Sequence, residues 1–178
     1  MANIVLGVSA SVAIHRGLDV ASELKKGGHD VTALMTPSAT KLIAPLQFQA
    51  ITGRRVFHDL FEGADDDAYD HLNPAREGDL LICAPATADL VGRLAHGLAD
   101  DMVATTAIAF SSEKPRLIAP AMNWRMWANP LVQRNVATLR EAGWELVSPA
   151  EGDLACGEQG PGRLAPIDQI VGAITAAL

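Results

Sequence analysis

The sequence has few cysteines, few basic residues and no long apolar run. Cys83 and Cys156 are its two cysteines, too few for a disulfide framework and without metal-site spacing, so we expect no metal. No apolar run approaches the ~20 residues that span a bilayer, and no basic segment precedes the first apolar run. The 14 Lys and Arg against 21 Asp and Glu give a net charge of −7, which opposes nucleic-acid binding. We therefore expect a cytoplasmic protein that binds neither membranes nor nucleic acids.

Hydrophobic residues are plentiful, at 49% of the chain, although aromatic residues make up only 4%. A chain of 178 residues can bury a sizeable core but leaves little room for a second domain. We find no internal repeat, low-complexity tract or linker. The expectation is one domain that covers residues 1–178.

Short apolar runs alternate with segments of helical periodicity. Strands are expected at 4–7, 31–35, 80–84, 116–119 and 144–147. Helices are expected at 12–24, 38–51, 87–96, 100–109, 126–141 and 167–177, the second with Ser38 as its N-cap. Five strand–helix units imply a parallel sheet with helices on both faces, because right-handed crossovers place them there. Ligands of such sheets bind outside the carboxyl ends of the strands.

Hydroxyl side chains gather at the first two strand-to-helix turns. Residues 7–11 place a glycine and two serines, Ser9 and Ser11, after the first strand, without the third glycine of a dinucleotide fingerprint or the Lys of a P-loop. Thr36 and Ser38 follow the second strand. Two such turns at neighbouring strand ends suit one mononucleotide phosphate, because free backbone amides and the helix dipole attract an anion there. The alternative, equally open from the residues, is that these hydroxyls only cap helices.

Three more polar residues stand near strand ends. Thr87, in residues 85–89, is a candidate for the same site or simply caps its helix. Asn123 closes the run 120–123 just past a strand; it is an N-cap or a carboxamide that holds a carboxylate. His71 precedes a strand, where a lone histidine is more often a surface or structural residue than a catalyst.

Cys156 stands in a segment, 152–164, with four glycines around it. This composition predicts a flexible loop rather than core. A structural cysteine belongs in a strand, as Cys83 does, so Cys156 is interpreted as a thiol that the loop delivers to a site.

With these segments in view, the sequence resembles the homo-oligomeric flavin-containing cysteine decarboxylases. Within that family it is most similar to the branch that acts on phosphopantothenoylcysteine. The matching runs lie in the family's order over nearly the whole chain: 84–90, 95–101, 120–123 and 154–164. Each run is weak evidence alone, and together they are specific.

The resemblance implies a flavodoxin-like (Rossmann-like) three-layer α/β sandwich with FMN at a subunit interface. The implied activity is the FMN-dependent decarboxylation of 4′-phosphopantothenoylcysteine to 4′-phosphopantetheine in coenzyme A biosynthesis. It also implies a homo-oligomer, either a trimer or a dodecamer of four trimers. Many bacteria fuse this domain to the synthetase that makes the substrate; since this chain ends at Leu178, a separate synthetase is the expected partner.

The family's site residues carry over to matching positions. The resemblance makes His71 the acceptor of the substrate's thiol proton, Asn123 the holder of its carboxylate and Cys156 the proton donor to the product. The implied cofactor-binding residues are Gly7, Ser9, Ser11, Thr36, Ser38, Ala86, Thr87, Ala88 and Asp89. The implied substrate-binding residues are Ala121, Met122, Asn123, Ala155 and Gly157.

Two departures and several alternatives accompany the resemblance. Leu-Asn-Pro follows His71 where the family usually has Ile-x-Leu, and Asp89-Leu90 replaces a common Asn-Thr. One alternative is a peptidyl-cysteine decarboxylase, a branch that tends to lack the loop cysteine. A non-catalytic flavin-binding regulatory protein is another, although His71, Asn123 and Cys156 are all present. A flavin prenyltransferase, which should not carry the Ala-Cys-Gly run, and a flavodoxin-like domain with another ligand are the remaining alternatives.

Overall fold

A five-stranded parallel sheet forms the centre of the protein. The structure, a computed structural model, describes residues 1–61, 72–153 and 159–178. The strands are β1 (Asn3–Val8), β2 (Asp30–Met35), β3 (Leu80–Ala86), β4 (Arg116–Pro120) and β5 (Glu145–Leu146). Their order is β2-β1-β3-β4-β5, and every neighbouring pair is parallel. This is the flavodoxin-like strand order, with the topological switch point between β1 and β3.

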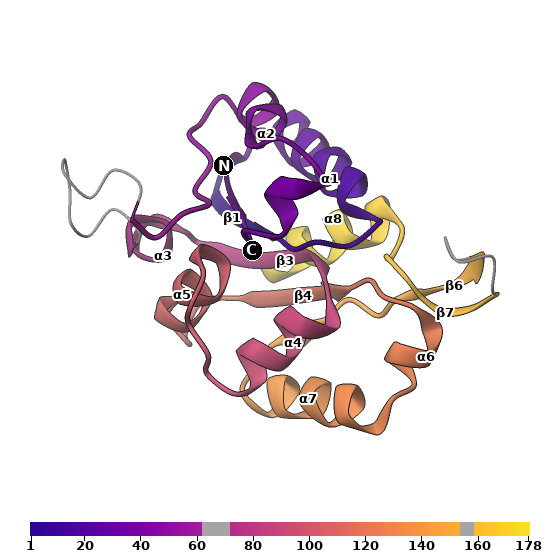
Figure 1. The fold of residues 1–178 in the computed structure, drawn as a ribbon. Coiled ribbons are helices and arrows are strands. Elements are labelled where there is room, and N and C mark those ends of the chain that lie inside the picture. The colour runs from indigo at the N-terminus through magenta and orange to yellow at the C-terminus, as the bar shows by residue number, and fades with distance from the viewer. Residues whose placement is uncertain (62–71, 154–158) are drawn as a thin grey trace.

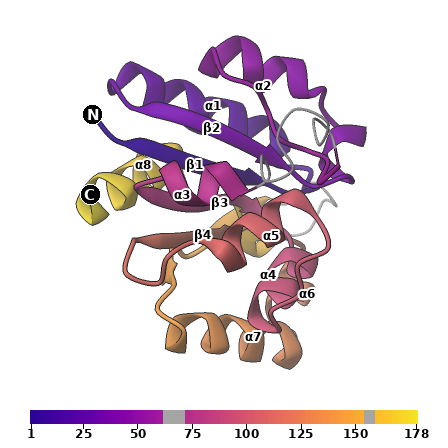
Figure 2. The same cartoon turned by 90° about the vertical axis from the view of Figure 1, so that its left-hand side faces the viewer.

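Helices cover both faces of this sheet (Figures 1 and 2). On one face lie α1 (Ile14–Lys26), α2 (Pro45–Thr52) and α8 (Ile167–Ala177), and on the other lie α4 (Ala88–Ala95), α5 (Met102–Ala109) and α7 (Pro130–Glu141). Strand β1 contributes Ile4 and Leu6 to the first core and Val5 to the second, because successive side chains of a strand point to opposite faces. The predicted three-layer α/β sandwich is confirmed.

The helix predicted over 38–51 is wrong in its extent. The structure has a short 3-10 helix, η1 (Ala39–Lys41), and then α2, which begins at Pro45. Proline has no backbone N–H, and it forces the preceding residue out of the helical region; Ala44 accordingly has an extended ψ of 135°. Ser38 makes no side-chain cap, whereas the hydroxyl of Thr36 accepts a hydrogen bond from the N–H of Ala39 at 3.2 Å.

The helix predicted over 126–141 is likewise two helices. A single turn, α6 (Trp124–Trp127), precedes α7, whose first residue is Pro130. The side chain of Asn129 caps α7 by accepting a hydrogen bond from the N–H of Leu131 at 2.9 Å. A cap followed by proline is a typical helix start, and it marks the break that helical periodicity alone did not show.

The prediction of a loop over the glycine-rich segment 152–164 is wrong at both ends of that segment, which belong to two strands. Strands β6 (Ala150–Asp153) and β7 (Gln159–Arg163) pair antiparallel. His71, Ala155, Cys156 and Gly157 lie outside the described residues. The structure adds a short helix that was not predicted, α3 (Asn73–Glu77). None of the helices in the described ranges has the length and apolar character required to cross a membrane.

Candidate active site

A cavity of about 660 Å³ lies at the carboxyl ends of β1, β3 and β4. The turns after these strands line it, together with the start of α1 and the β6–β7 hairpin. It lies beside the switch point of the sheet, where ligands of this fold class bind. The structure brings six of the predicted site residues together in its lining: Ser11, Thr87, Ala88, Ala121, Met122 and Asn123.

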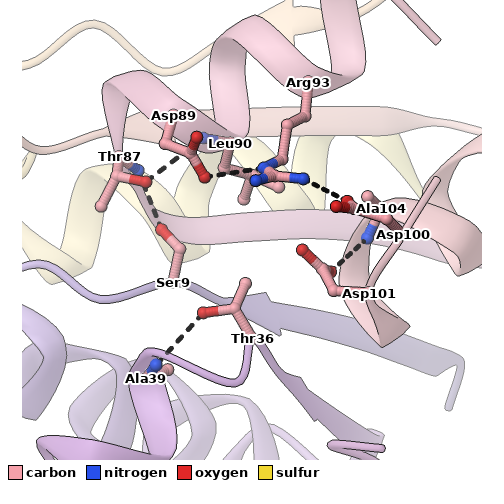
Figure 3. Close-up of polar contacts among 10 residues, drawn as sticks. All are labelled: Ser9, Thr36, Ala39, Thr87, Asp89, Leu90, Arg93, Asp100, Asp101 and Ala104. Carbon is pink, nitrogen blue, oxygen red and sulfur yellow. Dashed lines mark hydrogen bonds and ion pairs between the residues drawn. The ribbon is translucent and has the colours of Figure 1, made fainter. Parts of the chain in front are cut away.

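Ser9 lies behind this lining and joins two strand ends. Its side chain is almost fully buried, at 2% exposure. The hydroxyl donates a hydrogen bond to the carbonyl of Pro85 at 2.8 Å. It accepts one from the N–H of Thr87 at 2.8 Å, which Figure 3 shows. These two hydrogen bonds connect the end of β1 to the turn after β3.

Ser11 makes a similar link between β1 and β4. Its hydroxyl donates to the carbonyl of Ala121 at 3.2 Å and accepts from the N–H of Ala13 at 3.2 Å. The turn after β1 is thereby fixed to the turn after β4, and both line the cavity. Since a hydroxyl has one hydrogen to donate, the Ser11 side chain in this arrangement has no hydrogen left to donate to an anion.

Thr87 is the N-cap of α4, as the alternative interpretation held. Its hydroxyl accepts a hydrogen bond from the N–H of Leu90 at 3.3 Å. Asp89, in the first turn of α4, is exposed and pairs with Arg93 at 2.8 Å; Arg93 also pairs with Asp100 (Figure 3). The structure therefore shows Asp89 in a surface ion-pair cluster and not in the cavity lining.

Asn123 caps α6 and also lines the cavity. Its carboxamide oxygen accepts a hydrogen bond from the N–H of Arg125 at 2.8 Å, which fixes how the side chain is turned. An N-cap role and a ligand-binding role are thus compatible at this residue, because they use different atoms of one carboxamide.

The hairpin packs directly on the turn that carries Asn123. The N–H of Met122 donates to the carbonyl of Gly162 at 2.9 Å. A Cβ atom on Gly162 would lie 2.4 Å from the carbonyl oxygen of Met122, and Gly162 has a φ of 132°. Only glycine permits this approach and this backbone conformation. Nothing in the spacing of the sequence predicts the contact.

The remaining predicted cofactor residues lie outside the cavity lining. Gly7 is packed within the sheet, where an added Cβ would lie 2.8 Å from Val103. Ala86 ends β3 and is fully buried, Thr36 caps η1, and Ser38 is exposed on the turn after β2. The structure also places three basic residues in the lining that the sequence analysis did not select, and their type alone gave no signal: His15, Arg16 and Arg163.

Cys83 does not line the cavity. It is fully buried in β3, and burial, with a smaller effect from the charge of Asp101, raises the pKa of its thiol to about 12. A thiol that stays protonated and has no access to solvent is unreactive. The interpretation of Cys83 as a structural cysteine agrees with this environment.

The lining combines small side chains with the N-terminus of a helix. Small side chains form much of it, among them Ala10, Ala13, Ala88 and Ala121. The N-terminus of α1 faces the same space, and a helix N-terminus attracts negative charge. A volume of about 660 Å³ falls in the usual range of cofactor and small-molecule pockets, roughly 300–1,000 Å³.

Comparison with known sequences shows close relatives. A probable phosphopantothenoylcysteine decarboxylase of Streptococcus mutans is 38% identical over 168 residues, 94% of this chain and 94% of that protein. The coenzyme A biosynthesis bifunctional protein CoaBC of Bacillus subtilis is 41% identical over 169 residues, 95% of this chain and 41% of that protein. The chain therefore spans about two fifths of the length of the bifunctional relative.

Solved structures resemble this one over nearly its whole length. The FMN-dependent cysteine decarboxylase SpaF superposes with a TM-score of 0.85 at 32% identity, covering 99% of this chain and 95% of that one. A mutant PPC decarboxylase complexed with pantothenoylaminoethenethiol gives a TM-score of 0.86 at 28% identity, covering 98% and 97%. A family model described as Flavoprotein matches residues 1–178. The chain belongs to the flavoprotein family, which confirms the resemblance found in its sequence.

Proposed function

We propose that this protein catalyses the FMN-dependent decarboxylation of 4′-phosphopantothenoylcysteine to 4′-phosphopantetheine in coenzyme A biosynthesis. The observation that carries the proposal is the cavity at the switch point, with the fixed carboxamide of Asn123 in its wall. The names of relatives that match nearly the whole chain support the same activity.

The residues of the cavity fit an FMN. Thr87 and Ala88 would hold the flavin ring, and the turn at Ser11 with the start of α1 would hold the phosphate. Thr36 and Ser38 stay predictions as further contacts of the cofactor. When bound, a flavin supplies the electron acceptor that lets a cysteine thiol be oxidised before carbon dioxide leaves.

Asn123 orients the substrate by its carboxylate. Its carboxamide oxygen accepts the hydrogen bond from the N–H of Arg125, and the amide nitrogen is the donor group of this side chain. Two N–H donors on one planar group suit a carboxylate, and the cap prevents the carboxamide from turning its acceptor oxygen toward the negative charge. The neighbouring backbone of Ala121 and Met122 continues the same wall.

Two proton transfers are assigned from the sequence alone, since His71 and Cys156 lie outside the described residues. A neutral histidine near pH 7 is a suitable acceptor for the substrate's thiol proton. A thiol with an ordinary pKa of ~8.5 still carries its proton at neutral pH and can protonate the carbon that has lost carbon dioxide.

The proposal also includes the oligomeric state of the protein, its cellular location and its partner activity. The family resemblance supports a trimer, or a dodecamer of four trimers, in the cytoplasm. The bifunctional relatives support a synthetase as the partner activity that supplies the substrate. Light scattering of the purified protein tests the assembly, and a monomer that binds FMN tightly would contradict it.

The test of the activity is direct. The purified protein is loaded with FMN and incubated with 4′-phosphopantothenoylcysteine, and mass spectrometry follows the release of carbon dioxide and 4′-phosphopantetheine. A peptide that ends in cysteine is the control substrate. Turnover of the peptide alone would identify a peptidyl-cysteine decarboxylase, and failure to bind FMN would overturn the proposal.

A further inference from the structure

The cavity is cationic in a protein that is acidic overall. The chain has a net charge of −7, yet the ionised side chains of the lining are Arg16, Arg163 and Glu151, with His15 beside them. Cationic groups gathered in a concave site raise the local concentration of anionic ligands. The local charge, one positive side chain in excess, therefore favours an anionic ligand.

Among the residues that the structure describes, Arg163 differs from the other arginine of the cavity in having no partner. Arg16 pairs with Asp19 at 3.5 Å. Within residues 1–61, 72–153 and 159–178, by contrast, no hydrogen bond or ion pair engages the guanidinium of Arg163. Its Nη1 atom lies 3.4 Å from the position that a Cβ on Gly152 would occupy, so this glycine leaves space for the guanidinium. The charge is therefore available for a ligand.

The place of Arg163 in the fold assigns it to the substrate side of the cavity. It follows Gly162, whose carbonyl accepts the hydrogen bond from the N–H of Met122, next to Asn123. Arg16 and His15, by contrast, stand in the first turn of α1, beside the turn proposed to hold the cofactor phosphate. An anion on Arg163 thus belongs to the molecule that Asn123 binds.

We propose that Arg163 binds the phosphate of the substrate whose carboxylate Asn123 holds. This inference rests on the proposed function. A guanidinium suits a phosphate because its planar N–H groups can donate two parallel hydrogen bonds to it. Arg163 then determines specificity, since it favours a phosphorylated substrate over the same molecule without phosphate.

The test compares two substrates that differ only in this phosphate, 4′-phosphopantothenoylcysteine and pantothenoylcysteine. In Arg163→Gln, kcat/KM for the phosphorylated substrate should fall by about 10- to 100-fold, the value of one charge-assisted hydrogen bond. For the unphosphorylated substrate it should change less than about 3-fold. Arg163→Lys keeps the charge but not the planar donors and should recover part of the loss. Arg134→Gln, an exposed arginine of α7, is the matched control and should behave as wild type.

Other outcomes overturn the inference in recognisable ways. An equal loss on both substrates would place Arg163 at the reacting end or in folding. If Arg163→Gln binds FMN more weakly but riboflavin normally, measured by flavin fluorescence, the arginine holds the cofactor phosphate instead. If wild type turns over neither substrate, the proposed function has failed. Calorimetric titration of the FMN-loaded protein with 4′-phosphopantetheine and pantetheine then decides the inference separately, and equal affinities would refute it.

Discussion

The hydroxyl oxygen of Ser9 accepts a hydrogen bond from the backbone N–H of Thr87 at 2.8 Å, across 78 positions of the chain. The same hydroxyl donates to the carbonyl of Pro85, so one buried side chain satisfies two backbone groups of the turn after β3. That turn carries Thr87 and Ala88 into the cavity. The position of the cavity wall therefore depends on a residue that does not line it.

Ser9→Ala should destabilise the protein by about 1–3 kcal/mol, because the N–H of Thr87 loses its acceptor and the carbonyl of Pro85 keeps only the hydrogen bond from the backbone N–H of residue 9. The measurement is thermal or urea unfolding of the FMN-free protein. Ser38→Ala is the matched control; Ser38 is exposed and makes no cap, so its change should stay within about 0.5 kcal/mol. Equal effects of the two substitutions would show that the Ser9 hydrogen bonds do not stabilise the turn.

Substitutions of Asn123 should separate capping from substrate binding. Asn123→Asp keeps a good N-cap but presents a negative charge to the substrate carboxylate, so stability should be retained while kcat/KM falls by at least about 100-fold. Asn123→Ala removes both the N-cap and the carboxamide that binds substrate, and the loss of the cap should cost about 1 kcal/mol of stability. Unfolding curves and steady-state kinetics of the two variants, at unchanged FMN content, make the comparison. Normal kinetics of the Asn123→Asp variant would show that Asn123 acts only as an N-cap and does not bind the substrate carboxylate.

Gly162→Ala should impair the site more than the fold. The added Cβ would meet the carbonyl of Met122 at 2.4 Å, in a backbone conformation that other residues adopt at a cost of about 1–3 kcal/mol. We expect weaker substrate binding, measured as a raised KM. Gly172→Ala is the control, since nothing lies within 4 Å of its added Cβ in α8 and alanine is the better helix former. It should equal or exceed wild type in stability, and a matching loss in both variants would argue against the proposed contact.

Asp100 and Asp101 are neighbours whose removal should have opposite effects. Burial raises the pKa of Asp101, although backbone N–H groups of Ala104 and Val103 oppose the shift. A raised folded pKa means that stability is greatest below the ordinary value of 3.8 and falls as the pH rises through the folded pKa. Asp101→Asn keeps an N-cap without the charge, so at pH 7 it should be at least as stable as wild type, and this gain should vanish at acid pH.

The pKa of Asp100 is instead lowered, chiefly by its hydrogen bond with Arg93. Its contribution is present above the ordinary carboxyl pKa and is lost as the pH falls, so Asp100→Asn should slightly destabilise the protein at pH 7. The effect should be small, because the pair is exposed. Melting temperatures of both variants between pH 3 and 8 test the pair, and shifts of the same sign at pH 7 would contradict it.

The sheet could be predicted because its strands are continuous apolar runs, and runs such as Leu80–Ala86 are buried on both faces. Both helix breaks carried a signal in the sequence, Pro45 and Pro130, which the helical periodicity around them masked. The hairpin had no such signal, because β7 reads Gln-Gly-Pro-Gly-Arg, without strand-forming residues or alternation. Its position depends on contact with the turn at Met122, which local sequence does not encode. For the same reason, the position of Arg163 in the cavity lining could not be predicted from local sequence.

The contact between Gly162 and Met122 also constrains how this site can be altered. Two segments some 40 positions apart meet backbone to backbone, with no side chain between them to absorb a change in either. A hairpin transplanted from a relative should therefore function only when the turn over 121–123 is transplanted with it. The hairpin and the turn should therefore determine substrate preference together. Directed evolution of new specificities should yield coupled changes in both segments rather than single substitutions in one.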